Sequence, residues 1–441
     1  MVLNLHASPN FIFILADDLG YADLGCYGAR INRTPAIDGL AASGLRFTQG
    51  YSNSPVCSPT RYALLTGRYQ YRFRGGAEEP ISAERQSEPE MAVPPGHPTL
   101  PSLLRAAGYS TALIGKWHLG LPPHSGPLNS GYQEFFGPLG GAVDYFTHRG
   151  RNGEPDLHEG ESAVEVEGYL TDLLSDRAVQ YVHRQARSSR PFLLSLHYTA
   201  PHWPWQTREW ADRPDRSPDS ITHTDGGSVE IYYRMIKAMD EGIGRLIDAL
   251  TQTGQNRNTL IVFSSDNGGE RYSDVWPLVG QKMDLLEGGI RVPMIASWPA
   301  RIAAGGVTGQ VAISMDWVAT FLAAAGVTPD PRFAPDGMSL LDVFDRPGIA
   351  RERDLFWRML YRHQGALRSG DWKYLRIGGN EYLFDLGADM RERANIARHH
   401  PQRMADMKRR YAAWEATMPA VPEDARFRLA YTENDLPAAP K

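Results

Sequence analysis

The stretch NFIFILADD, residues 10–18, is an apolar run that ends in two carboxylates. Its large apolar side chains predict a buried strand. The segment that follows, residues 34–44, carries the signals of a helix, with Thr34 as the N-cap, Pro35 at the first helical position and Gly44 as the stop. A buried strand followed by a helix is the repeating unit of an α/β fold.

The same alternation continues through most of the chain. Further strands are predicted at residues 109–118, 191–202 and 258–269, each of which runs into polar residues. Helices are predicted between them at 169–186 and 228–254, where apolar residues recur at every third and fourth position. This order predicts an α/β fold with a large, mostly parallel sheet that is flanked by helices on both faces.

Beyond residue 326 the pattern changes to short strands separated by turns. The three strand candidates and a closing helix are residues 355–360, 366–377, 381–386 and 401–418. We therefore predict a large α/β domain of residues 1–340 and a C-terminal subdomain of residues 341–441 with a small antiparallel sheet. The residues from Pro419 onward are expected to form a loosely held tail.

The composition excludes several classes of protein. Hydrophobic residues make up 42% and charged residues 22% of the 441 residues, as in ordinary globular proteins. A formal net charge of −5 gives no sign of a nucleic-acid partner, and no apolar run approaches the ~18 residues of a membrane span. The opening residues MVLNLHASPN are too short and mixed for a signal peptide, so we expect a cytoplasmic location, with a removed leader and a periplasmic location as the alternative.

Acidic and amide side chains close two of the predicted strands. Asp17 and Asp18 close the first, and Asp266 and Asn267 close the last. Because ligands bind where the carboxyl ends of parallel strands meet, we expect these residues to form one site. Oxygen ligands suit Ca²⁺ or Mg²⁺ rather than zinc. Either pair alone would favour the cap of a turn, but the two pairs together predict a cation site.

Positive and acid–base groups follow other strands of the same sheet. They are Lys116, His118, His202 and Lys282. Each of them alone could be a solvated lysine or a core histidine. Around a cation they predict an anionic substrate, such as a sulfate, phosphate or phosphonate ester.

Cys57 is one of only two cysteines and lies in SPVCSPTRYALLTGRY, residues 54–69. Two cysteines exclude a disulfide scaffold, and Cys26 reads as a small buried hydrophobic residue. Ser58 and Pro59 have the chemistry of a helix N-cap and first turn, so the thiol could be a nucleophile with a lowered pKa. A soft thiolate is a poor partner for a hard cation, however, which leaves the role of this cysteine open.

Six motifs occur along the chain in a recognisable order. They are ADD at 16–18, PVCSPTRYALLTG at 55–67, GYSTALIGKWH at 108–118, APH at 200–202, SDNGG at 265–269 and GQKMDLLEGGIRVP at 280–293. The second and third resemble the two signatures of the formylglycine-dependent sulfatases, an arylsulfatase-like family of the alkaline phosphatase superfamily. With RSGDWKYL and YLFDL near the C-terminus, the resemblance covers nearly the whole chain and implies a sulfuric ester hydrolase.

The resemblance implies that Cys57 does not remain a cysteine. In that family a formylglycine-generating enzyme oxidises the cysteine to formylglycine, an aldehyde, and recognises the Pro and Arg of the motif, here Pro59 and Arg61. The metal would usually be Ca²⁺, with Mg²⁺ or Mn²⁺ as alternatives. Its implied ligands are Asp17, Asp18, Asp266, Asn267 and the modified Cys57.

The resemblance also implies the catalytic residues. They would be Cys57, Arg61, Lys116, His118, His202 and Lys282. The hydrated aldehyde would attack sulfur, held by Arg61 and supported by Lys116. His202 and Lys282 would contact the sulfate, with His202 as the proton donor to the leaving oxygen. His118 would help the second hydroxyl to expel sulfate and restore the aldehyde, a step that an ordinary serine could not perform.

The chain departs from the family pattern in two places. Residues 137–146 lack the serine with which several relatives touch the sulfate, so that contact is missing or comes from Asp144 or His148. Met390 stands where relatives often have proline, a change that we expect to matter only locally.

The stretch PHWPWQTREW, residues 201–210, places three tryptophans beside a site histidine. Trp203 and Trp205 could be packing residues or an aromatic wall for an aryl or sugar ring. Arg72 or Arg74 could reach further anionic groups. The residues expected to bind substrate are Lys116, His202, Lys282 and Trp203. The expected partner is a small-molecule or saccharide sulfate ester, with aryl and carbohydrate sulfates both open.

Three other functions fit parts of the sequence. A phosphonate monoester or phosphodiester hydrolase shares the fold, the formylglycine and the metal, and its monoanionic substrate resembles a sulfate ester. A metal-dependent phosphatase or phosphomutase would use Ser or Thr and two metals, a pattern that we do not find. A non-catalytic sulfate-ester-binding protein would leave Cys57 unconverted, although every polar role is filled here.

Overall fold

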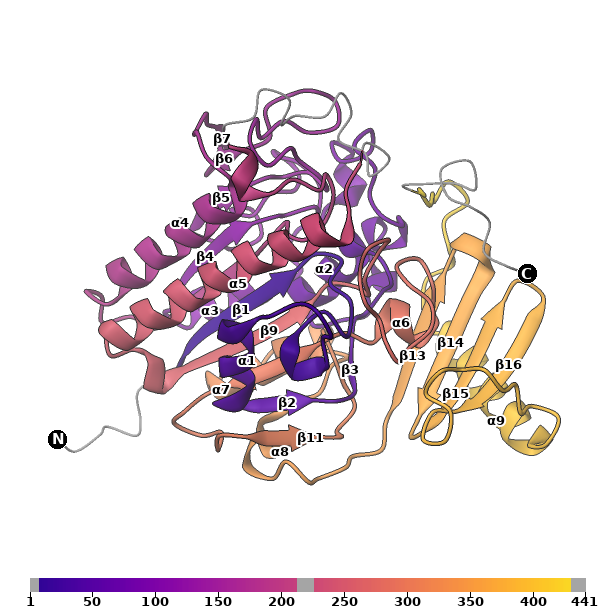
Figure 1. The fold of residues 1–441 in the computed structure, drawn as a ribbon. Coiled ribbons are helices and arrows are strands. Elements are labelled where there is room, and N and C mark those ends of the chain that lie inside the picture. Colours follow the sequence, from indigo (N-terminus) through magenta and orange to yellow (C-terminus); the bar gives the residue numbers. More distant parts are fainter. Residues whose placement is uncertain (1–7, 212–225, 430–441) are drawn as a thin grey trace.

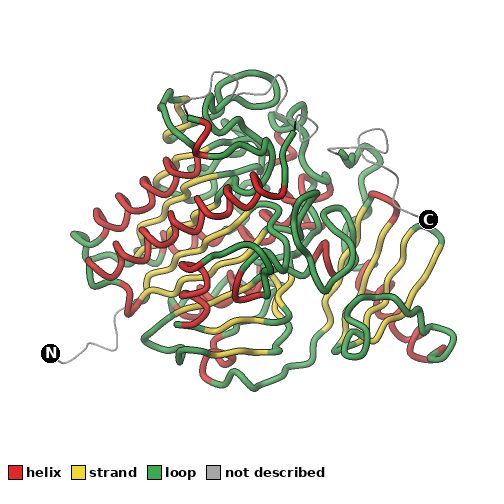
Figure 2. Tube along the Cα trace, in the orientation of Figure 1, coloured by secondary structure: helices red, strands yellow, loops and turns green. Residues whose placement is uncertain are grey.

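The computed structural model describes residues 8–211 and 226–429 (Figure 1). A large α/β body holds the chain as far as α8 (Leu341–Asp345), and a smaller sheet lies beside it with its own helix (Figure 2). The predicted α/β fold with a small C-terminal antiparallel sheet is confirmed. None of the described helices combines the length and the apolar character that a membrane span needs.

The large sheet has ten strands among the described residues, in the order β11-β2-β10-β9-β1-β8-β4-β5-β6-β7. Their bounds are β1 (Asn10–Ala16), β2 (Leu45–Phe47), β4 (Ser110–Gly115), β5 (Glu134–Gly137), β6 (His158–Glu159), β7 (Ser162–Ala163), β8 (Phe192–His197), β9 (Thr259–Ser265), β10 (Met294–Ser297) and β11 (Gly306–Thr308). The central strands β9, β1, β8, β4 and β5 pair in parallel, whereas β10 and the β6–β7 hairpin pair antiparallel. The carboxyl ends of the central strands therefore share one edge of the sheet.

Helices cover both faces of this sheet. The helices of the large body are α1 (Pro35–Ala42), α2 (Cys57–Thr66), α3 (Leu100–Ala106), α4 (Leu170–Gln185), α5 (Val229–Gln252), α6 (Glu287–Ile290), α7 (Asp316–Ala324) and α8 (Leu341–Asp345). On one face, Ile12 and Ile14 of β1 pack with α1, α4 and α5, the last two of which run side by side in Figure 1. On the other face, Phe11, Phe13 and Leu15 pack with α2, α3 and α7. Because both faces of β1 are covered, its apolar run is continuous rather than alternating.

The smaller sheet is an antiparallel meander of β13 (Asp354–Met359), β14 (Gln364–Ser369), β15 (Trp372–Ile377) and β16 (Asn380–Asp385), followed by α9 (Pro401–Glu415). The single strand candidate at 366–377 is a hairpin, since the chain turns at Gly370 with φ of 57°. Apolar residues of this sheet and α9 pack with Val56, Leu285 and Ile290, so the sheet supports segments of the large body. The predicted domain boundary falls between residues 340 and 341. Helix α8 begins just after that boundary, but its residues pack in the core of the large body. A separate two-stranded sheet consists of β3 (Gly50–Tyr51) and β12 (Ala312–Ile313), and Tyr51 and Ile313 pack with the small sheet.

The segment 419–429 is anchored, so the prediction of a loosely held tail is wrong for these residues. Phe427 forms a parallel bridge with Glu79, and the Asp424 carboxylate accepts hydrogen bonds from Arg74 and Arg85 at 2.9 and 2.8 Å. These anchors are ion pairs and backbone bonds to residues more than 300 positions away, which leave no local apolar pattern in the sequence. We call residues 419–429 the C-terminal strap. The rest of the predicted tail, 430–441, lies outside the described residues.

A buried ion cluster joins the small sheet to α6. Lys373 of β15 is fully buried, with its Nζ 3.0 Å from a Glu287 carboxylate oxygen and 2.8 Å from a Glu392 carboxylate oxygen. We expect Lys373→Met to lower the free energy of unfolding by about 3 kcal/mol, because two buried carboxylates lose their counter-charge. The control Lys408→Met removes an exposed pair with Glu381 and should cost less than about 1 kcal/mol. Urea denaturation measures both, and equal losses would contradict the assignment of Lys373 as a structural anchor.

Candidate active site

The predicted cation ligands meet at the carboxyl edge of the large sheet. Asp17 and Asp18 follow β1, and Asp266 and Asn267 follow the neighbouring strand β9. Backbone bonds align the two strand ends, since Asp266 N–H donates to the Ala16 carbonyl at 3.1 Å. All four ligand side chains are buried. The parallel pairing predicted from the sequence thus brings residues about 250 positions apart into contact.

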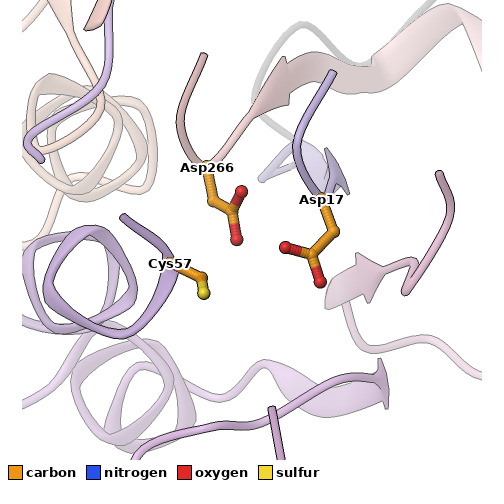
Figure 3. A group of neighbouring side chains, drawn as sticks. All are labelled: Asp17, Cys57 and Asp266. Carbon is orange, nitrogen blue, oxygen red and sulfur yellow. The ribbon is translucent and has the colours of Figure 1, made fainter. Parts of the chain in front are cut away.

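Cys57 faces two of these carboxylates. One ligand atom each of Asp17, Cys57 and Asp266 lies within 4.8 Å of the other two, and a second such group contains Asp17, Asp18 and His202. Figure 3 shows the side chains of Asp17, Cys57 and Asp266 converging on one space from three separate elements. The sulfur of Cys57 is thus placed beside the predicted cation site.

Two buried oxygens make this space fit a cation. Oδ1 of Asp17 and Oδ1 of Asn267 are buried and have no hydrogen-bond partner among the described residues. The Asn267 amide group donates to Asp18 Oδ1 at 2.7 Å and to the Gly268 carbonyl at 2.9 Å, which fixes its orientation. Asp18 is held at a φ of 66°, in the left-handed region that non-glycine residues seldom adopt. Buried acceptors without donors are stabilised by a hard cation, so the donor set fits Ca²⁺ or Mg²⁺.

Three basic side chains surround the carboxylates. Lys116 Nζ lies 2.5 Å from Asp17 Oδ2, Lys282 Nζ lies 2.7 Å from Asp18 Oδ2, and Arg61 lies 2.8 Å from Asp266 Oδ2. Burial alone would raise the pKa of Asp18, but the charges of Lys282 and His202 outweigh it and lower that pKa to about 2. For Asp266, burial and the charge of Asp17 prevail and raise the pKa to about 7. The carboxylates and basic groups thus form one coupled network.

The helix that carries Cys57 begins two residues earlier than predicted, since Ser58 was expected as the N-cap. Helix α2 starts at Cys57 itself, and Val56 occupies the N-cap position in an extended conformation. Ser58 does not act as the cap, because its hydroxyl accepts a hydrogen bond from the Ile81 N–H at 2.9 Å. Burial raises the pKa of the Cys57 thiol to about 11 despite the nearby Lys116 and Lys282. The lowered pKa considered for this thiol is therefore wrong, and an unmodified Cys57 would be a poor nucleophile at neutral pH.

The two predicted site histidines are buried and differently oriented. His202 Nδ1 donates to the Trp203 carbonyl at 2.6 Å, which directs Nε2 to within 3.6 Å of Asp18 Oδ2. His118 Nε2 lies 3.0 Å from the Ile81 carbonyl, and its Nδ1 has no hydrogen-bond partner among the described residues. Burial, with the charge of Lys282 for His202 and of Lys116 for His118, holds both pKa values well below the usual histidine value. Each ring thus presents one nitrogen that can accept a proton.

A cavity of about 900 Å³ opens above this cluster. Five of the predicted site residues line it, namely Cys57, His118, His202, Trp203 and Lys282. Arg61 and Lys116 do not line it; they lie fully buried against Asp266 and Asp17. Lys116, predicted to bind substrate, is therefore placed beneath the floor of the cavity. The volume is within the range of ligand-binding sites and exceeds what a lone sulfate needs.

Several charged residues that line the cavity were not predicted from the sequence. They are Arg151, Glu270, Arg362 and Arg428. Glu270 directly follows the SDNGG motif, which could have drawn attention to it, and burial raises the pKa of its carboxyl group to about 8. The arginines come from three segments that no local pattern connects. They belong to a loop, to the turn after β13 and to the C-terminal strap.

Some residues considered for the substrate lie elsewhere. Arg72 pairs with Asp336 at 2.8 Å and Arg74 pairs with Glu78 at 2.7 Å, and neither lines the cavity. Trp205 is buried against Tyr272, with ring centroids 4.7 Å apart, and is a packing residue.

The alternative sulfate contacts are likewise outside the cavity. The carboxylate of Asp144 accepts a hydrogen bond from Gln206, and His148 contacts the Gly168 carbonyl. Met390 lies in the loop after β16, away from the cavity.

Comparison with known proteins adds independent information. A family model described as Sulfatase matches residues 9–327. N-acetylgalactosamine-6-sulfatase of Homo sapiens is 33% identical over 368 residues, which cover 79% of this chain and 68% of that protein. Arylsulfatase A of Homo sapiens is 31% identical over 437 residues, covering 91% and 82%.

Solved structures agree with these matches. A crystal structure of Ps i-CgsB in complex with k-i-k-neocarrahexaose superposes with a TM-score of 0.82 at 31% identity, covering 92% of each chain. The phosphonate monoester hydrolase of Agrobacterium radiobacter superposes with a TM-score of 0.64 at 19% identity, which shows a shared fold alone.

Proposed function

The chain belongs to the sulfatase family, and from this we propose that it removes sulfate from a saccharide sulfate ester, using formylglycine formed from Cys57 and a bound Ca²⁺ ion. The enzyme is a sulfuric ester hydrolase, as its relatives are. One observation carries the assignment of the site: Asp17, Cys57 and Asp266 converge within 4.8 Å at the floor of a cavity, next to buried oxygens that have no donor.

The proposed ligands of the cation are Asp17, Asp18, Asp266, Asn267 and the modified Cys57. When present, the hydrated formylglycine supplies an oxygen nucleophile and the cation neutralises sulfate oxygens. Arg61 joins Asp266 to the Lys116 carbonyl, at 2.8 and 2.9 Å, and so keeps the ends of two strands in register around Cys57. Lys116 in turn holds Asp17. These two basic residues orient the ligands from below rather than contact the ester.

Lys282 and His202 would act on the substrate from the cavity wall. The Lys282 ammonium lies between Asp18 and the cavity, where it can neutralise a sulfate oxygen. An anionic ester beside His202 favours protonation of its Nε2, which can then give that proton to the leaving oxygen. The Nδ1 of His118 has no partner among the described residues. This nitrogen is suited to take up the proton of the second hydroxyl in the step that expels sulfate.

A saccharide is the substrate class that the cavity supports best. The cavity is large, and polar, charged and apolar residues line it, among them Trp203, which is 5% exposed. A relative of 31% identity is described with a bound neocarrahexaose, and another relative is named for a sulfated amino sugar. An aryl sulfate remains the second candidate because arylsulfatase A is 31% identical. A phosphodiester is not supported beyond the shared fold.

The formylglycine-generating enzyme is the proposed partner in maturation. Cys57 is only 2% exposed and lies in the first turn of α2, so such an enzyme would need to act before this region folds.

Relative rates test the proposal. We expect kcat/KM for N-acetylgalactosamine 6-sulfate and for 4-nitrophenyl sulfate to exceed that for bis(4-nitrophenyl) phosphate, with inorganic sulfate as the product. Faster turnover of the phosphodiester would overturn the assignment and favour the phosphonate hydrolase reading.

The role of His202 predicts a dependence on the leaving group. His202→Ala should lower kcat/KM by about 100-fold for a sugar sulfate, whose alkoxide needs a proton, and by less than about tenfold for 4-nitrophenyl sulfate. The control His148→Ala removes a buried histidine outside the cavity and should leave both rates near wild type. Equal losses on both substrates would remove His202 from the role of acid.

A further inference from the structure

Two arginines from distant parts of the chain meet in the cavity wall. Arg151 lies in a loop of the large body, and Arg428 lies in the C-terminal strap. The Arg151 guanidinium lies over the Trp203 ring, 5.6 Å from its centroid, and Trp203 in turn lies 4.4 Å from the His202 ring. Arg151 is therefore one aromatic ring away from the residue proposed to act on the leaving oxygen.

Arg428 is held toward the same region by the strap. Its backbone N–H donates to the Glu79 carbonyl at 3.0 Å, and its guanidinium lies 3.2 Å from both carboxylate oxygens of Glu84. The side chain remains 42% exposed, so an incoming group can reach the guanidinium. The strap thus positions Arg428 at the cavity without burying it.

Arg151 and Arg428 line the same cavity, and Glu84 is the carboxylate that pairs with Arg428 among the described residues. Burial and the charge of Arg428 lower the pKa of Arg151, while Glu84 only partly offsets this. No carboxylate of the described residues lies within ion-pair distance of Arg151. Two guanidiniums that line one accessible cavity suit an anion with several oxygens, since such an anion can neutralise both.

The acidic residues in the same wall do not cancel these charges. Asp156 accepts hydrogen bonds from two backbone N–H groups at 2.9 Å, and Asp284 lies 3.9 Å from Arg362 and accepts from the Gln281 N–H. Glu270 lies near Lys282 at the floor. The remaining lining carboxylates, Glu154 and Glu161, are solvent-exposed.

We propose that Arg151 and Arg428 bind a second anionic group of the substrate, a sulfate or a carboxylate, on the sugar adjacent to the one that loses its sulfate. The inference rests on the proposed function and goes beyond it, because it specifies a polyanionic saccharide rather than an isolated sulfated sugar.

Binding to the full-length Cys57→Ala protein tests this without turnover. Calorimetry in the presence of Ca²⁺ would compare a monosulfated disaccharide, a disulfated one and a monosulfated one that carries a uronate. We expect the disulfated or uronate ligand to bind about tenfold more tightly than the monosulfated one, and Arg151→Gln or Arg428→Gln to abolish that preference. Whichever of the two ligands gains affinity identifies the second group as sulfate or carboxylate.

Two further variants separate binding from a loss of structure. Glu84→Gln removes the carboxylate that competes for Arg428 and should tighten binding of the doubly anionic ligand about threefold, a gain that misfolding cannot produce. Arg426→Gln, on the same strap but outside the cavity, should change nothing. Two outcomes would overturn the inference. One is equal affinity for all three ligands in the Cys57→Ala protein that keeps both arginines. The other is equal weakening of all three ligands by Arg428→Gln. The proposed function fails separately, if the wild-type enzyme with converted Cys57 releases no sulfate from any ester.

Discussion

Replacing Cys57 by alanine is expected to lower turnover of every sulfate ester by about 10⁴-fold or more, with little change in stability. Alanine removes the atom from which formylglycine is made and leaves the surrounding carboxylates in place. The matched control is Cys26→Ala, the other cysteine, which is partly buried against the core of the large body and lies outside the cavity. We expect the control to retain full activity.

Mass spectrometry of the tryptic peptide of residues 47–61 from active protein accompanies the kinetics. We expect a mass in which the thiol is replaced by the aldehyde or its hydrate. An unmodified thiol in fully active protein would contradict the mechanism and mean that Cys57 acts directly. An unmodified thiol in inactive protein would mean that the maturing enzyme was absent, and maturation in a host that has it then restores activity if the mechanism holds.

The second large effect concerns the cation. Asp17→Asn is expected to lower kcat by about 10³-fold and to remove the bound metal, because Asp17 carries a buried oxygen without a hydrogen-bond partner among the described residues and belongs to the group with Cys57 and Asp266. The amide oxygen of the substituted side chain can still accept a hydrogen bond from Lys116, so the protein should still fold. Metal content per chain, measured by plasma emission spectroscopy together with kcat, checks both parts.

The control for Asp17→Asn is a second buried aspartate. Asp240 of α5 accepts hydrogen bonds from the backbone N–H groups of Ala36 and Ile37, far from the cavity, so Asp240→Asn should keep metal and activity. Thorough chelation of the wild type should reproduce the loss seen with Asp17→Asn, and added Ca²⁺ should restore it. Unchanged turnover after both treatments would falsify the cation hypothesis.

Much of the fold could be read from local patterns. The continuous apolar run of β1 predicts a strand covered on both faces, and the structure places helices on each. Parallel pairing then requires the residues after β1 and β9 to meet, which is why Asp17, Asp18, Asp266 and Asn267 could be grouped before any coordinates. Their roles as ligands stay predictions, as do the catalytic roles of the lysines and histidines.

Other features escaped because they depend on long-range electrostatics. The sequence does not show that Lys116, predicted to bind substrate, pairs with Asp17, 99 positions earlier in the chain. The C-terminal strap has no apolar period, and ion pairs with Arg74 and Arg85 hold it. Local sequence patterns do not predict such contacts, because a charged residue has the same sequence signature whether it is paired or exposed to solvent.

The sequence by itself determined the order of strands and helices, the family resemblance and the identity of the oxygen cluster, because each depends on local periodicity or on motifs of a few residues. Only the tertiary structure decided which residues line the cavity. Arg151 and Arg428 are 277 positions apart and share no motif. They line one cavity because the strap returns to the large body, where Phe427 bridges to Glu79 and Asp424 pairs with Arg74 and Arg85.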